Sequence, residues 1–135
     1  MEQPAVTRDQ LGKLTRVALP EPLPPPPRRW SAAEWAAIRQ GHRSRDMDDK
    51  WHAFVEAHRL FLHRSWTGRG LYEAQFTRGE DSWSITELLV CGDRSTYRRA
   101  SDDYETLFVE AIIDYLLLGI RDTDALTRLR SMPRN

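Results

Sequence analysis

The chain has a single cysteine, Cys91, among its 135 residues. One thiol cannot form an internal disulfide or a cysteine-based zinc cluster, so we expect a reducing compartment such as the cytoplasm. The sequence also has no apolar run close to the roughly 20 residues that a membrane-spanning helix needs. The N-terminal residues lack the apolar segment of a secretory signal, which again favours a cytoplasmic protein with no membrane partner.

The sequence also has no excess of either basic or acidic residues. The 20 basic and 20 acidic side chains give a formal net charge of zero. Proteins that bind nucleic-acid phosphates usually need a basic surplus, so we expect no nucleic-acid partner, and any anion site must be local. What the composition does provide is 40% hydrophobic residues, enough for one core in a chain of this length.

Most prolines lie near the N-terminus, where the run Pro24-Pro25-Pro26-Pro27 occurs. We predict that residues 1–29 form a flexible, proline-rich tail and that residues 30–131 form a single α+β domain. Residues 132–135 are expected to be a frayed C-terminus. The domain begins with the capping box Ser31-Ala32-Ala33-Glu34, which predicts a short helix over Ala32–Gln40.

A second capping signal, Asp102 followed by Glu105, predicts a long helix over Asp103–Leu118 that ends at Gly119. Apolar residues recur along it at helical spacing and form a stripe for packing on a sheet. The last turns are apolar nearly all round. We therefore expect a second buried side within the domain, or a homodimer formed through this helix. A weak helix over Thr123–Ser131 follows.

Between the two helices the apolar period changes to two and predicts strands. They are expected near Lys50–Glu56, Leu60–Trp66, Gly70–Arg78 and Ser82–Cys91. The links are so short that only an antiparallel meander can join them. The predicted fold is thus α+β: a four-stranded antiparallel β-meander with a short N-terminal helix and a long C-terminal helix packed on the sheet.

The turn lengths predict the register of this sheet. A two-residue turn at Ala57-His58 would place His52 opposite His63, and a symmetric second loop would place Arg64 opposite Glu73. We expect the side richer in aromatic residues to face the core: Phe54, Phe61, Tyr72, Ala74, Phe76, Trp83, Ile85 and Leu89. A slip of one residue would exchange the faces, and the reverse side also carries apolar residues: Trp51, Val55, Leu60, Leu62, Leu88 and Val90.

The first predicted hairpin concentrates side chains that suit a phosphorylated, ring-containing ligand. Arginine offers a planar fork for phosphate, tryptophan a surface for stacking, and a Thr-Gly turn further donors. The candidate ligand-binding residues are Lys50, Trp51, Arg64, Trp66 and Thr67. Alternatively, Arg64 pairs with Glu73 and the two tryptophans merely cover the sheet. The favoured hypothesis is a small cytosolic binding or accessory module, and a purely structural or homo-oligomeric protein is a further alternative.

An enzymatic alternative uses the same region. In a hydrolase or transferase, Asp48 or Asp49 would be the base and His63 the acid, with Arg64 stabilising the developing charge. A cross-strand pair of His52 and His63 would offer two imidazoles to a metal. No known ligand spacing accompanies them, however, so we expect neither a metal nor a cofactor.

The segments RDMDDKWHAFVE and RLFLHRSWTGRGLYEAQF carry a resemblance. Together, over Arg45–Phe76, they resemble small, mostly uncharacterised bacterial proteins with a DKW strand, an HRSWTG strand and a LYE strand. Similar segments accompany ADP-ribose-processing domains such as macro domains or ADP-ribosylglycohydrolases. The resemblance implies a stand-alone companion module with a nucleotide-like or ADP-ribose-like ligand, and it supplies no catalytic residues. The positions concerned are Asp49, Lys50, Trp51, His63, Arg64, Ser65, Trp66, Thr67 and Gly68.

Overall fold

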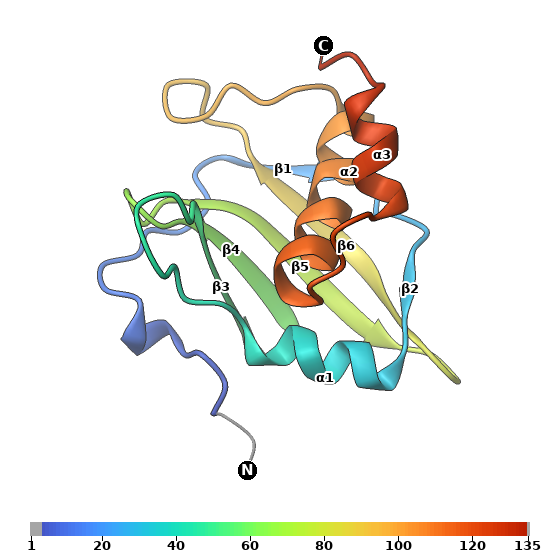
Figure 1. Cartoon of the computed structure of the whole chain (residues 1–135). Coiled ribbons are helices and arrows are strands. Elements are labelled where there is room, and N and C mark those ends of the chain that lie inside the picture. The colour runs from blue at the N-terminus through green and yellow to red at the C-terminus, as the bar shows by residue number, and fades with distance from the viewer. Residues whose placement is uncertain (1–3, 135) are drawn as a thin grey trace.

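The computed structural model describes residues 4–134 (Figure 1). Residues 1–3 of the predicted tail and Asn135 of the predicted frayed end lie outside the described residues. The short helix α1 (Ala32–Gln40) has the predicted bounds. Its capping box is formed in both directions, because Ser31 Oγ accepts from the Glu34 amide and the Glu34 carboxylate accepts from the Ser31 amide.

Within residues 4–134 the antiparallel sheet contains six strands, so the prediction of four strands was wrong in number. The predicted meander is present as β3 (Trp51–Glu56), β4 (Arg59–Arg64), β5 (Gly70–Arg78) and β6 (Trp83–Cys91). Two further strands, β1 (Pro20–Leu23) and β2 (Arg29–Trp30), pair with β6, and the order is β1-β6-β5-β4-β3. β1 carries Pro20 and Pro22, which hide it from a search for alternating β-formers, although proline is tolerated at a sheet edge. β2 has only two residues, too few to show an alternating pattern.

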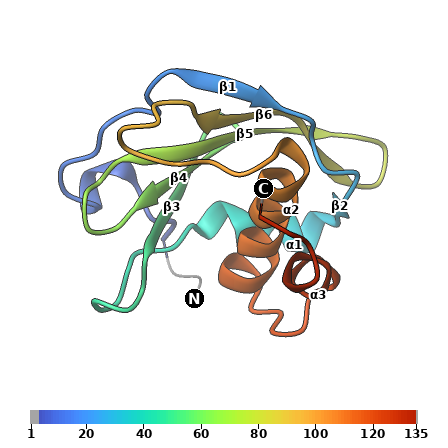
Figure 2. The same ribbon diagram turned by 90° about the horizontal axis from the view of Figure 1, so that it is seen from above.

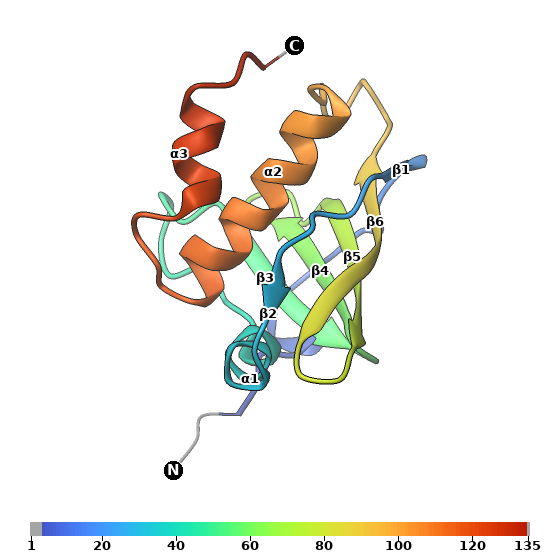
Figure 3. The ribbon, with the colours of Figure 1, turned by 90° about the vertical axis from the view of Figure 1, so that its right-hand side faces the viewer.

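The helices lie together on one side of the sheet (Figures 2 and 3). The predicted long helix is shorter as a regular helix: α2 (Asp102–Ile112) passes into a π-helical turn, η2 (Ile113–Leu117). A short α3 (Asp124–Arg130) follows and packs its apolar residues on α2. α3 therefore covers the side of α2 that carries Leu107 and Ala111, whereas Tyr115, in the last turns, is 55% exposed. The homodimer through this helix stays a prediction.

The face of β3 and β4 that packs against the helices is the opposite of the predicted one. His52 does lie opposite His63, as expected. However, the register between β4 and β5 passes from the pair Leu62–Tyr72 to the pair His63–Gly70, which leaves Leu71 as an extra residue. The extra residue exchanges the two faces of β3 and β4 relative to those of β5, so the side chains predicted to face the helices point away from them. Consequently the helix-facing core takes in Leu60 and Leu62 together with Tyr72, Ala74 and Phe76.

The aromatic residues of β3 and β4 that were expected in this core lie on the other face, where the N-terminal segment covers them. Phe54 and Phe61 stack with ring centroids 4.9 Å apart. The Arg8 guanidinium, in the short helix η1 (Arg8–Gln10), lies 4.9 Å from the centre of the Phe54 ring and forms an ion pair with Glu56. Part of the predicted tail is therefore a layer of the fold. Within residues 4–134, no helix has both the length and the apolar character needed to cross a membrane.

Candidate ligand-binding site

Four of the five predicted ligand-binding residues line one cavity of about 260 Å³. It lies where β3, β4 and the loop before β5 meet the connection between β6 and α2. The lining residues are Lys50, Arg64, Trp66, Thr67, Arg69, Leu71, Thr96 and Tyr97. We call this hollow the basic cavity, because three of its side chains are cationic and none is acidic.

The loop that carries Trp66, Thr67 and Arg69 is fixed by its backbone. Gly68 has a φ of +72°, and a side chain there would meet the Lys13 carbonyl oxygen at 2.1 Å. The Thr15 amide donates to the Gly68 carbonyl, and the Thr15 carbonyl accepts from the Gly70 amide, both at 2.9 Å. The N-terminal segment thus holds the loop in place from outside, which no local sequence pattern in the loop reveals.

The three cations of the basic cavity have no acidic partner within the described part of the chain. The Arg64 guanidinium lies over the Trp51 ring, 4.6 Å from its centre, and Lys50 Nζ lies 5.5 Å from the centre of the Trp66 ring. Such cation–π contacts leave the N–H donors free to bind an anion. Trp66 itself is 65% exposed.

Arg64 does not pair with Glu73, as the alternative prediction had it. Glu73 lies opposite Phe61 and accepts from Arg59 Nε at 2.8 Å. Arg59 also donates to Glu87 at 2.8 Å. β4 ends at Arg64, whose amide donates to the Arg69 carbonyl, and Glu73 lies opposite Phe61, three residues earlier on β4. Arg64 therefore does not pair with Glu73 and is available beside the cavity.

One wall of the basic cavity is supported by a buried carboxylate. Glu105 is 0% exposed and accepts from the Tyr97 hydroxyl at 2.7 Å, from the Tyr72 hydroxyl at 2.5 Å and from the Ala100 amide at 3.1 Å. Burial, followed by the bond to Glu105, raises the pKa of Tyr97 to about 12, and burial raises the pKa of Tyr72 further. Both hydroxyls therefore stay protonated at neutral pH and serve as donors.

A second cavity, of about 410 Å³, adjoins the basic cavity at Lys50, which lines both. Apolar side chains from the sheet and from α2 and η2 form one part of its wall: Trp51, Phe108, Ile112, Tyr115 and Leu116. Asp46, Asp48 and Asp49 form the polar part with Arg45. We call it the acidic cavity; its carboxylates disfavour a phosphate but can accept from hydroxyl or amino groups.

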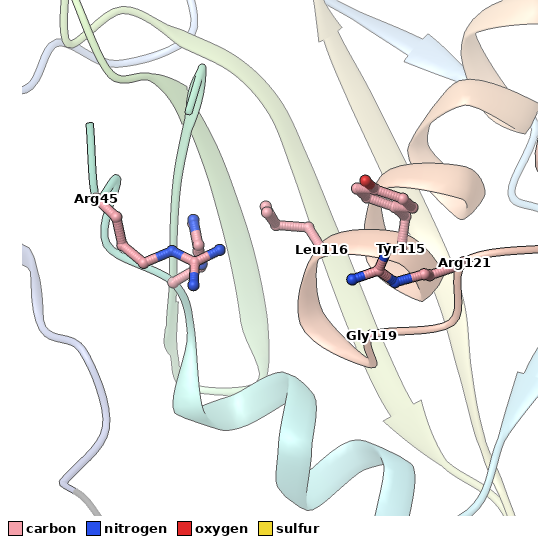
Figure 4. A pocket seen from close by; sticks show the side chains of 6 residues that line it. Arg45, Tyr115, Leu116, Gly119 and Arg121 are labelled. Carbon is pink, nitrogen blue, oxygen red and sulfur yellow. The ribbon is translucent and has the colours of Figure 1, made fainter. Parts of the chain in front are cut away.

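A third hollow, of about 380 Å³, shares Arg45, Tyr115 and Leu116 with the acidic cavity. The Arg45 and Arg121 side chains extend into it from opposite sides, with Tyr115 and Leu116 between them (Figure 4). Gly119 lies at its edge. The π-helical turn positions Tyr115 and Leu116 here, in line with the frequent occurrence of such turns at functional sites.

The candidate acid and base are not brought together. Asp48 is exposed, while Asp49 accepts from His42 Nε2 at 2.6 Å and from the Arg45 amide at 3.0 Å. Burial opposes ionisation of Asp49, but these bonds outweigh it and lower its pKa. His63 points to the opposite face of β4 from Arg64 and stacks on Phe54, with ring centroids 5.5 Å apart. The hydrolase or transferase hypothesis stays a prediction.

Both sheet histidines have structural partners. His63 Nδ1 donates to the Gly68 carbonyl at 3.0 Å, and His52 Nδ1 accepts from the Ser44 amide at 3.0 Å. Burial lowers the pKa of each. No group of three or more metal-ligating side chains with the geometry of a metal site occurs among residues 4–134.

The sequence did not identify Arg69, Thr96 and Tyr97 as members of the site. Arg69 lies in the predicted turn, two positions after Thr67. Its positive charge next to Gly68 was the feature of the sequence that could have indicated an anion-binding residue. Thr96 and Tyr97 belong to the polar connection before α2, and only the fold brings that connection to the hairpin. Comparison of the chain with protein-family models, curated proteins and solved structures returned no match.

Proposed function

We propose that the chain is a small binding module for a phosphorylated, ring-containing ligand such as a nucleotide or ADP-ribose. The observation that carries this proposal is the basic cavity. Lys50, Arg64 and Arg69 surround one hollow without an acidic partner among the described residues, beside the exposed Trp66 ring. Arginine forks and a lysine ammonium are the groups that proteins use to bind phosphate.

The two adjoining cavities suit two different parts of one ligand. The basic cavity, at about 260 Å³, lies below the roughly 300–1,000 Å³ usual for a whole small-molecule ligand. A phosphate would occupy it, with Thr67 as a further donor. The ring and its hydroxyls would extend past Lys50 into the acidic cavity, where apolar walls suit a ring and Asp48 accepts from hydroxyl groups.

Titration of ADP-ribose, AMP and ATP, followed by tryptophan fluorescence, tests the proposal. We expect saturable binding at submillimolar ligand, with adenosine alone and inorganic phosphate alone at least tenfold weaker, since each fills one cavity only. The variant Trp66→Phe identifies how much of the signal comes from the exposed indole. Absence of any response at millimolar nucleotide would refute the proposal.

A pair of matched variants tests whether the nucleotide binds in the basic cavity. Arg64→Gln should weaken binding at least tenfold, because it removes a charged donor to the phosphate. Arg78→Gln removes an exposed arginine from the far end of β5 and should leave binding unchanged. Equal effects of the two variants would show that binding depends on overall charge and would contradict the site.

A further inference from the structure

A fourth cavity, of about 320 Å³, lies between the proline run and the helices α2 and α3. It shares no lining residue with the three cavities described above. Pro24–Pro27 form one wall, and Leu107 and Met132 contribute apolar surface from the helical side. We call it the proline cavity. Neither the sequence motifs nor the proposed nucleotide site accounts for it.

A carboxylate without a partner lines the proline cavity. The Glu110 residue is only 8% exposed, and within residues 4–134 its carboxylate has no hydrogen bond and no ion pair. Its oxygens are not sealed in the interior but keep accessible surface at the cavity. Asp114, four residues later in η2, differs sharply: it accepts from Trp30 Nε1 at 2.9 Å and pairs with Arg28. Buried carboxylates normally have such partners, because desolvating an unpaired charge is costly. Glu110 thus differs from Asp114 in presenting its carboxylate to the cavity without a partner from the described part of the chain.

The proline wall determines which groups a ligand can bond to. Prolines have no amide N–H, so the wall presents rings and carbonyl acceptors but no backbone donor. One acceptor is already used, since Thr106 Oγ1 donates to the Pro24 carbonyl at 2.7 Å. The one cation in the lining, Arg128, is 60% exposed at its side chain and lies 3.8 Å from Asp124. The cavity therefore offers acceptors and apolar surface, and Asp103 adds a further carboxylate.

We propose that the proline cavity binds an alkylammonium group, with the Glu110 carboxylate as its counter-ion. An ammonium supplies three N–H donors, which match Glu110 and the free proline carbonyls. Its aliphatic part would lie against the proline rings, Leu107 and Met132. An anionic ligand is disfavoured by two lining carboxylates, and a neutral apolar ligand would leave Glu110 without a partner. This site is independent of the proposed nucleotide site.

Titration of n-butylammonium chloride into the full chain, followed by amide chemical shifts in ¹H–¹⁵N NMR spectra, tests the assignment. We expect saturable shifts on α2 around Glu110 and at Leu107, with 1-butanol, the neutral analogue, at least tenfold weaker. Equal binding of the amine and the alcohol, or shifts confined to other parts of the chain, would overturn the proposal.

The variant Glu110→Gln preserves the size of the side chain and removes its charge, so it should fold and bind n-butylammonium at least tenfold more weakly. Glu80→Gln, at an exposed glutamate of the β5–β6 turn, should bind like the wild type. Unchanged affinity in Glu110→Gln would refute the role of the carboxylate. If that variant did not fold, the comparison of amine and alcohol on the wild type would still decide.

A parallel titration with Nα-acetyl-lysine methylamide identifies the source of the ammonium group. Tighter binding than n-butylammonium would support the lysine side chain of a partner polypeptide, because the flanking amides gain contacts. Weaker binding would support a free aliphatic amine. Failure of both amines to bind would overturn the site itself. Nucleotide binding in Glu110→Gln should equal that of the wild type, so the two proposed sites can fail separately.

Discussion

Arg59 and Arg64 lie at opposite ends of the same strand, β4, and have different surroundings. Arg59 donates to Glu73 and Glu87, both at 2.8 Å, and its charge is used within the protein. Arg64 contacts the face of Trp51 and has no acidic partner among residues 4–134. The comparison shows that an arginine on a strand is a candidate for ligand binding only once its internal partners have been accounted for.

Two carboxylates near the helices differ in the same way. Asp49 is held by His42 and by the Arg45 amide, whereas Glu110 has no partner in the described part of the chain. The pKa of Asp49 is lowered, while burial and then the neighbouring Asp114 raise the pKa of Glu110. A charge with partners stabilises the fold, and a buried charge without them costs stability but remains available to a ligand.

The largest expected effect is on the arginine with two partners. Arg59→Gln leaves Glu73, whose side chain is 9% exposed, without its cation, and should lower the free energy of unfolding by about 2–3 kcal/mol. Urea denaturation measures it. Arg64→Gln loses only a cation–π contact and should cost less than about 1 kcal/mol. Equal losses would break the comparison between the two arginines.

Ligand binding should reverse this order. Arg64→Gln is expected to weaken AMP binding roughly tenfold, about 1.4 kcal/mol, while Arg59→Gln retains the wild-type affinity under conditions where it is folded. Fluorescence titration at two salt concentrations sharpens the test, because a phosphate contact weakens as salt screens it. A salt-independent affinity would contradict binding at the three cations.

Local structure in this chain was predictable because local signals determine it. The capping box at Ser31 and Glu34 gave α1 its bounds, and the two-residue turn at Ala57-His58 gave the pairing of His52 with His63. Both residues of that turn have positive φ despite not being glycine. Four residues grouped by their chemistry within one hairpin, Lys50, Arg64, Trp66 and Thr67, also line one cavity, while their role in binding stays a prediction.

The remaining features depend on contacts between distant segments. The bulge at Leu71 decides which face of β3 and β4 meets the helices, and the symmetric loop assumed from the sequence could not reveal it. The pairing of β1 with β6 is a non-local contact between a proline-containing segment and an apolar strand. Tyr97 reaches the cavity because Glu105 on α2 binds its hydroxyl, which is again a tertiary contact.

Asp49 should make the stability of the protein depend on pH in acid. Its pKa is lowered in the folded protein, so its stabilising contribution is fully present above the ordinary pKa of about 3.9 and is lost as the pH falls through the lower, folded value. Asp49→Asn should cost about 1 kcal/mol at pH 7 and should flatten the acid limb of the stability curve. Urea unfolding between pH 2 and pH 7 measures both effects. An unchanged acid limb would show that the pair with His42 contributes nothing.

The smallest effect, and the one of opposite sign, is expected at Glu110. Because its folded pKa is raised, the folded state binds a proton more tightly than the unfolded chain, and stability falls as the pH rises from the ordinary value of about 4.3 through the raised one. Glu110→Gln removes this penalty and should gain up to about 1 kcal/mol at pH 7. Thermal unfolding at pH 4 and pH 7 measures the gain, which should be smaller at pH 4. A variant that is more stable than the wild type and yet loses n-butylammonium binding would show that this carboxylate serves a ligand at the expense of the fold.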